Sequence, residues 1–370
     1  MSWFLAFAGF AALIILHEFG HFTAAKAVGM RVERFNLFFP PHIVDVKRGE
    51  TSYGIGAIPL GGYVKITGMN PNEVIPPEAA DRAYYRQPVW KRITVIFAGP
   101  FMNFLIAFAI LVALFIGNGI VHTALRVDQV ESSGAAAGRL LPGDRIVSVD
   151  GRPGDAPNLS DAQTARRQLA LRAAVGRHRC AGRAADGCVA TTPATVVVRR
   201  GEQLVTLRIR PRYSAAAGTM LLGFRYATDT EDVGPLRAAG LSANTMWTVT
   251  TATVGGIVRI FYDTQARKEV SGVVGSYEAT RQSFAFDTTR ALYILALISL
   301  SLAVVNLFPF LPLDGGHIFW ALAERIRGRP IPFAVMERAS VVGFMLVAIL
   351  FVIGLTNDIG RLTGDGFNMR

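Results

Sequence analysis

Residues 3–25 of the chain read WFLAFAGFAALIILHEFGHFTAA, and Glu18 is the one Asp, Glu, Lys or Arg in this stretch. A helix of this length crosses the hydrocarbon core of a bilayer. Ionisable groups inside such a helix are costly, so His17, Glu18 and His21 predict a functional site at membrane depth. A cleavable signal peptide begins with a basic segment, and no Lys or Arg precedes Lys26 here. We therefore expect the helix to be retained.

Three further stretches, 93–120, 291–310 and 334–355, are similarly long and apolar. Apolar residues make up 51% of the 370 residues and charged residues 18%, below the roughly 25% of soluble domains. The net charge is +11, but the basic residues are scattered in runs of at most two, which does not favour nucleic acid as a partner. The sequence predicts an α-helical polytopic membrane protein with four transmembrane helices, embedded in a lipid bilayer.

Basic residues near the ends of these stretches predict the orientation. Residues 26–92 contain ten Lys or Arg, the link between the third and fourth stretches contains Arg325, Arg327 and Arg329, and Arg338 follows near the start of the fourth stretch. Both segments should face the cytoplasm, which leaves the two termini and residues 121–290 outside it. Within the latter, residues 238–258 lack charge but are rich in Thr and Gly, with apolar residues at helical spacing. We expect an interfacial amphipathic helix there, not a fifth span.

The pattern between the second and third stretches changes to short alternating runs, as in 144–151, 194–199 and 204–209, which predicts a β-rich domain. The phrase GRLLPGDRIVSVDG at 138–151 resembles the core of a PDZ domain, and the resemblance covers about residues 121–212. Such domains bind extended peptides along a sheet edge, so the resemblance implies a substrate filter or a dock for a peptide ligand. The alternative is a spacer that only occludes the membrane-embedded site.

Cys180 and Cys188 are the only cysteines, and both lie in an Arg-, Gly- and Ala-rich insertion of this domain. Because thiols oxidise outside the cytoplasm, we predict a disulfide between them. A zinc-binding pair is the weaker alternative, since the spacing is wide and there is no second cysteine pair.

The motif His17-Glu18-Phe-Gly-His21 has the HExxH spacing, which places both imidazoles on one helix face where they can bind one Zn²⁺, with Glu18 beside them as general base. The alternative is that the two histidines bind no metal and only form hydrogen bonds between helices. A catalytic zinc takes three protein ligands, and the third apolar stretch supplies Asp314 after Pro309 and Pro312. Helices one and three run in the same direction, so the three groups reach the same depth. His317 is the rival third ligand.

These motifs together resemble the site-2 protease family of intramembrane zinc metalloproteases, most closely the bacterial regulator-of-sigma-E type. The resemblance rests on HExxH in the first span, NxxPxxxLDG at 306–315, and the intervening PDZ-like segment. Shorter matches are AGPFMN at 98–103, GIG at 54–56, LGGYVK at 60–65 and SGVVG at 271–275, where Val273 replaces the family's usual Pro. Better-studied members can carry two PDZ domains, whereas one fits here.

The resemblance implies an HExxH metalloprotease core built from residues 1–120 and 291–370, with a PDZ-like domain at 121–212 and a linker at 213–290 that holds the interfacial helix. Zinc bound by His17, His21 and Asp314 would activate water, Glu18 would take its proton, and Asn306 would hydrogen-bond the substrate backbone or the oxyanion. The Gly-rich stretch 51–66, including Gly54 and Gly56, would form a hairpin that dips into the membrane and holds an unwound substrate. A plain cytosolic hairpin is the alternative.

The family analogy implies a single-span membrane protein, such as an anti-sigma factor, as the substrate, and the bacterial cytoplasmic membrane as the location. Two other functions compete with this one. A zinc transporter would need ligands distributed along a path, whereas these groups share one depth beside Glu18. A pseudoprotease scaffold that keeps only PDZ binding would not need Glu18 and Asp314.

Overall fold

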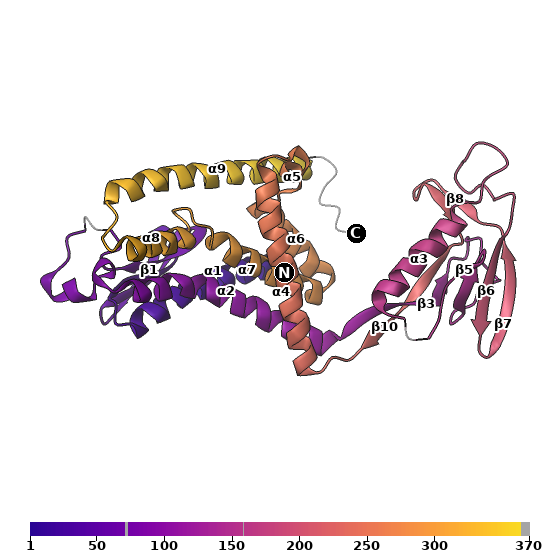
Figure 1. Cartoon of the computed structure of the whole chain (residues 1–370), viewed down its shortest axis with the longest axis horizontal. Helices are drawn as coiled ribbons and strands as arrows, with labels where there is room; N and C mark the ends of the chain where they lie inside the picture. Colours follow the sequence, from indigo (N-terminus) through magenta and orange to yellow (C-terminus); the bar gives the residue numbers. More distant parts are fainter. Residues whose placement is uncertain (71–72, 158, 364–370) are drawn as a thin grey trace. The chain divides into compact units, whose positions relative to one another are not determined.

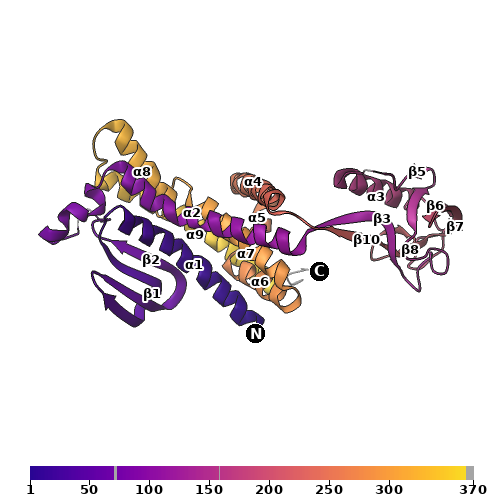
Figure 2. The same cartoon turned by 90° about the horizontal axis from the view of Figure 1, so that it is seen from below.

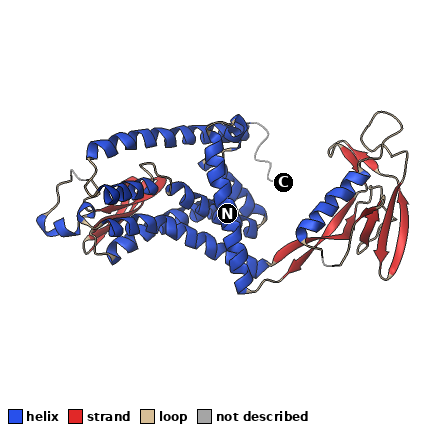
Figure 3. Cartoon of the chain, viewed as in Figure 1, coloured by secondary structure: helices blue, strands red, loops and turns tan. Residues whose placement is uncertain are grey.

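The computed structural model describes residues 1–70, 73–157 and 159–363. The chain forms two compact units, which we call the core unit (Met1–Gly117 and Gly234–Arg370) and the inserted unit (Asn118–Val233). Figure 1 follows the chain through both units, and Figure 3 shows that the core unit is mostly helical while the inserted unit carries most of the strands.

The first part of the core unit contains a helix, a two-stranded sheet, two short 3-10 helices and a second long helix. These elements are α1 (Ser2–Ala27), β1 (Val32–Arg48), β2 (Thr51–Ile66), η1 (Pro77–Arg82), η2 (Tyr84–Arg86) and α2 (Val89–Asn118). The second part is helical throughout, with α4 (Pro235–Ile260), α5 (Thr264–Glu269), α6 (Val273–Phe286), α7 (Thr288–Asn306), α8 (Asp314–Arg327) and α9 (Phe333–Thr363).

Four helices of the described residues are long and apolar enough to cross a membrane, namely Ser2–Ala27, Val89–Asn118, Thr288–Asn306 and Ala334–Thr363. They coincide with the four predicted stretches. The third helix ends at Asn306, earlier than the predicted 310, because the chain leaves the helix before Pro309. The predicted interfacial segment is helix α4, which is not among the four candidates and runs across α2 and α9 instead of along them (Figures 1 and 2).

The Gly-rich stretch at 51–66 is not a hairpin by itself, as the sequence suggested, but forms one long strand, β2, paired with β1. The turn of the hairpin lies at Gly49 and Glu50. Both strands bend, so that residues 34–37 pair with 62–65 and also with 52–55. Sequence alternation within β2 could not reveal this pairing, because the partner strand lies outside the Gly-rich stretch.

The core beside the sheet joins elements that are distant in sequence. Ala25 at the end of α1, Val32 and Ile66 from the sheet, and Val95 and Ile96 from α2 are all buried in one cluster. A second cluster joins α2 to α7 through Ala107, Leu300 and Val304. These contacts fix the end of α1 against the sheet and α2, and they fix α2 against α7.

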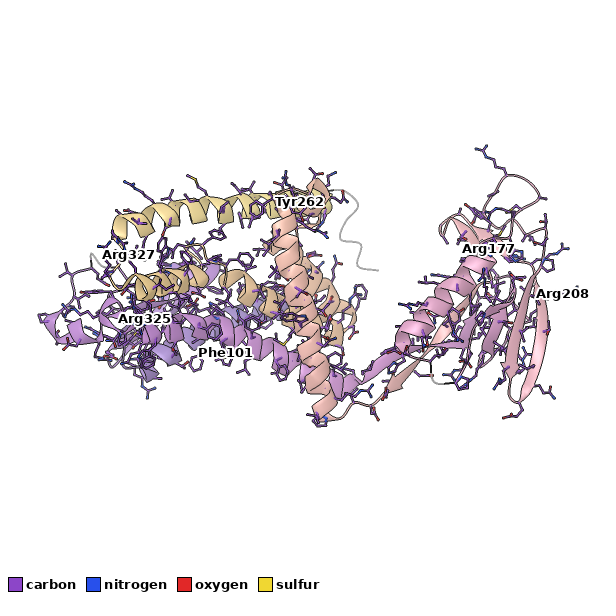
Figure 4. All side chains as sticks on the ribbon, in the orientation of Figure 1. Phe101, Arg177, Arg208, Tyr262, Arg325 and Arg327 are labelled. Carbon is purple, nitrogen blue, oxygen red and sulfur yellow. A yellow bond between two sulfur atoms is a disulfide. The ribbon has the colours of Figure 1, made fainter. Side chains whose placement is uncertain are left out.

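The link between the third and fourth spans contains helix α8, which is 14 residues long. Figure 4 shows Arg325 and Arg327 at the far end of this helix from Asp314. The predicted linker at 213–290 also has more structure than expected. Its first part holds three strands of the inserted unit, and its last part holds α5 and α6, of which α6 contacts α1, α7 and α9.

The inserted unit is built on one sheet of the order β10-β3-β4-β6-β7, with β5 paired to β4 and a separate β8–β9 pair. Its elements are β3 (Ile120–Val130), β4 (Arg145–Val149), β5 (Arg152–Pro153), α3 (Asp161–Val175), β6 (Ala194–Arg200), β7 (Gln203–Ile209), β8 (Arg212–Ser214), β9 (Thr219–Leu221) and β10 (Phe224–Glu231). The three alternating runs predicted from the sequence are β4, β6 and β7. The unit ends at Val233, beyond the predicted boundary at 212, because β10 pairs with β3.

Local sequence signals explain the details of this sheet. Asp150 and Gly151 both have positive φ, at 49° and 76°, which is the type I′ turn that closes a two-residue hairpin between β4 and β5. The Asp144 side chain is buried before β4 and accepts hydrogen bonds from Arg200 and from the backbone of Leu141. Cys180 and Cys188 are bonded to each other, with Cα atoms 6.2 Å apart.

Candidate active site

Three potential metal ligands meet where α1 approaches the start of α8. His17 Nε2 and His21 Nε2 lie 3.3 and 3.4 Å from Asp314 Oδ2, and 3.3 Å from each other. Both imidazoles are buried. Among the described residues, these three form the group of His, Cys, Asp and Glu side chains whose ligand atoms could hold one metal ion.

The triangle fits the requirements of zinc. Ligands about 2.0–2.1 Å from a tetrahedral Zn²⁺ are separated from one another by about 3.3 Å, and these three atoms have that spacing. Asp314 Oδ2 is buried and has no hydrogen-bond partner among the described residues. A buried carboxylate oxygen without a partner is unfavourable, and a cation between the three atoms would satisfy it.

The outer nitrogens of both imidazoles face α2. His21 Nδ1 donates a hydrogen bond to the backbone oxygen of Val95 at 2.8 Å, which leaves Nε2 free to bind a metal. His17 Nδ1 lies 3.1 Å from the side-chain nitrogen of Asn103. Helix α2 therefore orients both histidines of the HExxH motif.

Two glycines allow α1 and α2 to approach closely at this point. A Cβ on Gly20 would lie 2.3 Å from the backbone oxygen of Ala98, and a Cβ on Gly99 would lie 2.2 Å from His21 Nε2. Neither distance is possible for a real side chain. The AGPFMN stretch at 98–103 thus supplies the space that His21 occupies, a role that the sequence motif alone did not reveal.

Asp314 is the first residue of α8, where an acidic side chain is stabilised by the helix dipole. The next two residues must be glycines for steric reasons, because a Cβ on Gly315 would lie 2.2 Å from the backbone oxygen of Leu307, and one on Gly316 would lie 2.5 Å from the nitrogen of Leu311. The loop after α7 therefore folds directly onto the start of α8 and presents Asp314 to the histidines.

A bidentate ion pair fixes α8 further along its length. The Arg92 guanidinium on α2 donates to both carboxylate oxygens of Glu324, at 2.6 and 3.0 Å, and the Arg92 side chain is only 10% exposed. Because two parallel hydrogen bonds define orientation as well as distance, this pair holds α8 in place against the helix that orients both histidines.

Glu18 lies on α1 facing β2. It is half-buried, and a Cβ on Gly62 would lie 2.9 Å from Glu18 Cγ and 3.2 Å from Ile14 Cγ2. The sheet can pass this close to the catalytic-base candidate only because residue 62 has no side chain. The sequence motif LGGYVK contained Gly62, but nothing in the sequence assigned it a contact with Glu18.

The other predicted site residues fall in different places. Asn306 ends α7 with its side-chain nitrogen 3.5 Å from His17 Nε2, so it lies beside the candidate metal site. Gly54 and Gly56 pack within the sheet, where added Cβ atoms would meet the backbone oxygens of Val44 and Phe39 at 2.9 and 2.1 Å. His317 is half-buried on α8 and does not belong to the group of three ligands.

An HExxH helix of membrane-spanning length, joined by an aspartate from a broken helix, defines the class of membrane-embedded metalloproteases. The model of Peptidase family M50 matches residues 5–350, which is most of the chain. The chain belongs to this family of site-2 proteases and is a zinc metalloendopeptidase and an integral membrane protein.

Similar proteins agree with this assignment. The chain is 30% identical to a protein of Rhizobium meliloti over 95% of its own length and 94% of that protein, and 31% identical to one of Synechocystis over 95% and 93%. The names of both include the words zinc metalloprotease. Zinc metalloprotease Rip1 of Mycobacterium tuberculosis is 30% identical, with 94% of each chain covered.

Proposed function

We propose that this protein cleaves a transmembrane segment of a single-span membrane protein, with His17, His21 and Asp314 as the zinc ligands. The observation that carries the proposal is the triangle of 3.3, 3.3 and 3.4 Å between their ligand atoms, of which Asp314 Oδ2 is buried without a hydrogen-bond partner among the described residues. His17 and His21 belong to a helix of membrane-spanning length, which supports a reaction within the bilayer.

Each side chain of the site has a distinct task. Bound zinc supplies Lewis-acid activation of water. Glu18 follows His17 directly in the HExxH motif and takes the proton from the attacking water, then returns it to the leaving amine. Asn306, at 3.5 Å from His17, donates a hydrogen bond to the carbonyl oxygen of the scissile peptide as negative charge develops there.

The sheet formed by β1 and β2 supports the handling of the substrate. A transmembrane helix hides its backbone, so the scissile segment must be extended before it can be cut. The contact between Gly62 and Glu18 brings β2 next to the base, and the sheet exposes apolar side chains such as Ile43, Val46 and Ile55. An apolar sheet beside the site is suited to enter the membrane and to pair with an unwound substrate.

The inserted unit is proposed as a PDZ-like domain on the extracytoplasmic side. The phrase at 138–151, on which the PDZ resemblance rests, contains the buried Asp144 directly before β4 and the type I′ turn at Asp150-Gly151. We infer that it excludes proteins with large ectodomains, because a protease open to every single-span protein would be hazardous. An anti-sigma factor already shortened outside the bacterial cytoplasmic membrane fits this requirement.

Replacing Glu18 by Gln tests the reaction. We expect the full-length protein to keep stoichiometric zinc, because the three ligands are unchanged, and to lose cleavage by at least about 10²-fold, the usual range for a general base. Zinc is measured by elemental analysis, and cleavage by the accumulation of a truncated single-span protein in membranes. Glu78→Gln, at an exposed glutamate of η1, is the matched control and should retain activity. Cleavage by the Glu18→Gln variant at the wild-type rate would refute the role of Glu18.

A further inference from the structure

Asn103 is a buried polar residue of α2 to which the proposed reaction gives no role. Its exposed fraction is 0%, and its side-chain nitrogen Nδ2 lies 3.1 Å from His17 Nδ1. The other side-chain atom, Oδ1, is buried and has no hydrogen-bond partner among the described residues. The backbone oxygen of Asn103 accepts a hydrogen bond from Ser299 Oγ of α7 at 3.0 Å.

The ring nitrogen of His17 that faces the proposed metal site determines which way this amide can face. The Nε2 atom of His17 is the one directed at Asp314 and His21, so zinc would bind there. A neutral imidazole that binds a metal through Nε2 carries its proton on Nδ1, which is then a hydrogen-bond donor. A donor on His17 facing the NH₂ group of Asn103 leaves two donors opposed at 3.1 Å.

Rotation of the amide by half a turn removes this conflict. The oxygen and nitrogen of an asparagine side chain have almost the same shape, and their assignment follows from the hydrogen bonds they make. After rotation, Oδ1 occupies the position 3.1 Å from His17 Nδ1 and accepts its proton. The side chain is completely buried, so water does not compete for this hydrogen bond.

We propose that Asn103 is a positioning residue of the zinc site, whose Oδ1 accepts a hydrogen bond from His17 Nδ1–H when the metal is bound. This inference rests on the proposed zinc ligation by His17. The hydrogen bond fixes the tautomer and the ring orientation of His17, as the backbone oxygen of Val95 does for His21. A single helix, α2, then supplies the acceptors for both imidazoles, one from a side chain and one from the backbone.

Two substitutions of Asn103 distinguish a hydrogen-bond acceptor for His17 from a residue that only fills space. Asn103→Leu keeps the approximate shape but removes the acceptor. Asn103→Asp keeps an acceptor and cannot donate, so it suits a protonated His17 Nδ1 and opposes an unprotonated one. Ser299→Ala is the matched control, because it removes a buried hydrogen bond at the same helix crossing without touching His17.

The experiment measures zinc affinity of the purified full-length protein in detergent by competition with a chelator. Loss of an outer-shell partner costs 10–100-fold in metal affinity, so we expect this loss in Asn103→Leu. Asn103→Asp should bind zinc at least as tightly as the wild type, and Ser299→Ala should stay within about threefold of it. The absorption spectrum of bound Co²⁺ should change in Asn103→Leu and not in Ser299→Ala.

Two results would overturn the inference: wild-type affinity in Asn103→Leu, or affinity lost equally in Asn103→Leu and Asn103→Asp. If Asn103→Leu does not fold, Asn103→Asp decides alone, since weakened zinc binding in that variant contradicts an acceptor role. A failure of the proposed site looks different, because the wild-type protein would then bind no zinc at all.

Discussion

Asp314 is the residue on which the identity of the metal site depends most directly. Its Oδ2 atom closes the triangle with the two histidines, while His317, one helical turn later on α8, lies outside the group of three. We expect Asp314→Ala to lose bound zinc, because two histidines alone do not form a catalytic zinc site. His317→Ala should retain it. Zinc content after removal of free metal, measured by elemental analysis, distinguishes the two variants.

Stoichiometric zinc in Asp314→Ala together with loss in His317→Ala would assign the third ligand to His317 instead. The comparison is informative because both residues belong to one helix and are changed to the same small side chain. A general disturbance of α8 would affect both variants alike.

Three glycines are as important for the geometry of the site as the metal ligands are. Gly20, Gly99 and Gly62 allow α2 and β2 to approach α1 more closely than any other residue type would permit. Sequence motifs located Gly99 and Gly62, but not their partners, because the clash that excludes a Cβ involves residues distant in the chain. His17, Glu18 and His21 were predictable because HExxH has a fixed spacing, whereas Asp314 was predicted from the prolines that interrupt the third apolar stretch and from the direction of the spans.

At the scale of elements, long apolar helices were predictable and the sheet beside them was not. Hydrophobic length alone identifies a membrane span, so the four candidate helices follow directly from the sequence. The pairing of β1 with β2 depends on the contact of the sheet with the end of α1, where Ala25, Val32 and Ile66 are buried together. Such long-range packing leaves no periodic signal in the strand itself.

The turn between β1 and β2 is held by an ion-pair network at the end of α1. Glu50 accepts hydrogen bonds from Arg82 at 2.7 and 2.9 Å and from Lys26 at 2.5 Å. The hydrogen bonds from Arg82 and then from Lys26 lower the pKa of Glu50 to about 2. A lowered carboxyl pKa gives stability that is present above the unfolded value of 4.5 and is lost as the pH falls toward 2.

We therefore expect Glu50→Gln to lower the unfolding temperature at pH 7, and to lower it by less at pH 3. The network is partly exposed, so solvent screening limits the cost at pH 7 to about 1 kcal/mol. Thermal unfolding of the full-length protein in detergent at both pH values measures the effect. Glu78→Gln serves as the control, and an equal loss by Glu50→Gln at both pH values would contradict the ion-pair explanation.

At the scale of the whole molecule, the chain inserts one unit into another through a pair of adjacent strands. β3 and β10 pair from Ile120 opposite Glu231 to Val130 opposite Phe224, so the inserted unit begins and ends at neighbouring positions. A unit with adjacent ends can be added between α2 and α4 without separating them. The sequence did not reveal this closure, because the partner of β3 lies about a hundred residues further along the chain.

The proposed topology places the inserted unit outside the cytoplasm, and its two cysteines provide a test within the natural sequence. Basic residues gather at 26–92 and at the end of α8, where Arg325 and Arg327 extend from the helix in Figure 4. Segments rich in Lys and Arg remain on the cytoplasmic side, which leaves residues 118–233 on the other side. Thiols are oxidised there, and Cys180 and Cys188 are joined to each other.

Alkylation of intact cells or oriented vesicles, followed by mass spectrometry, should therefore label neither cysteine before reduction. After a reductant is added, a membrane-impermeant reagent should label both from the extracytoplasmic side, because no other cysteines occur in the chain. Closing a loop of eight residues removes little entropy from the unfolded chain, so Cys180→Ser with Cys188→Ser should cost about 2 kcal/mol or less and leave proteolysis intact. Free thiols in the unreduced protein would exclude the disulfide. Labelling from the cytoplasmic side alone would exclude the proposed topology, since the two cysteines lie in a unit that must be entirely on one side of the membrane.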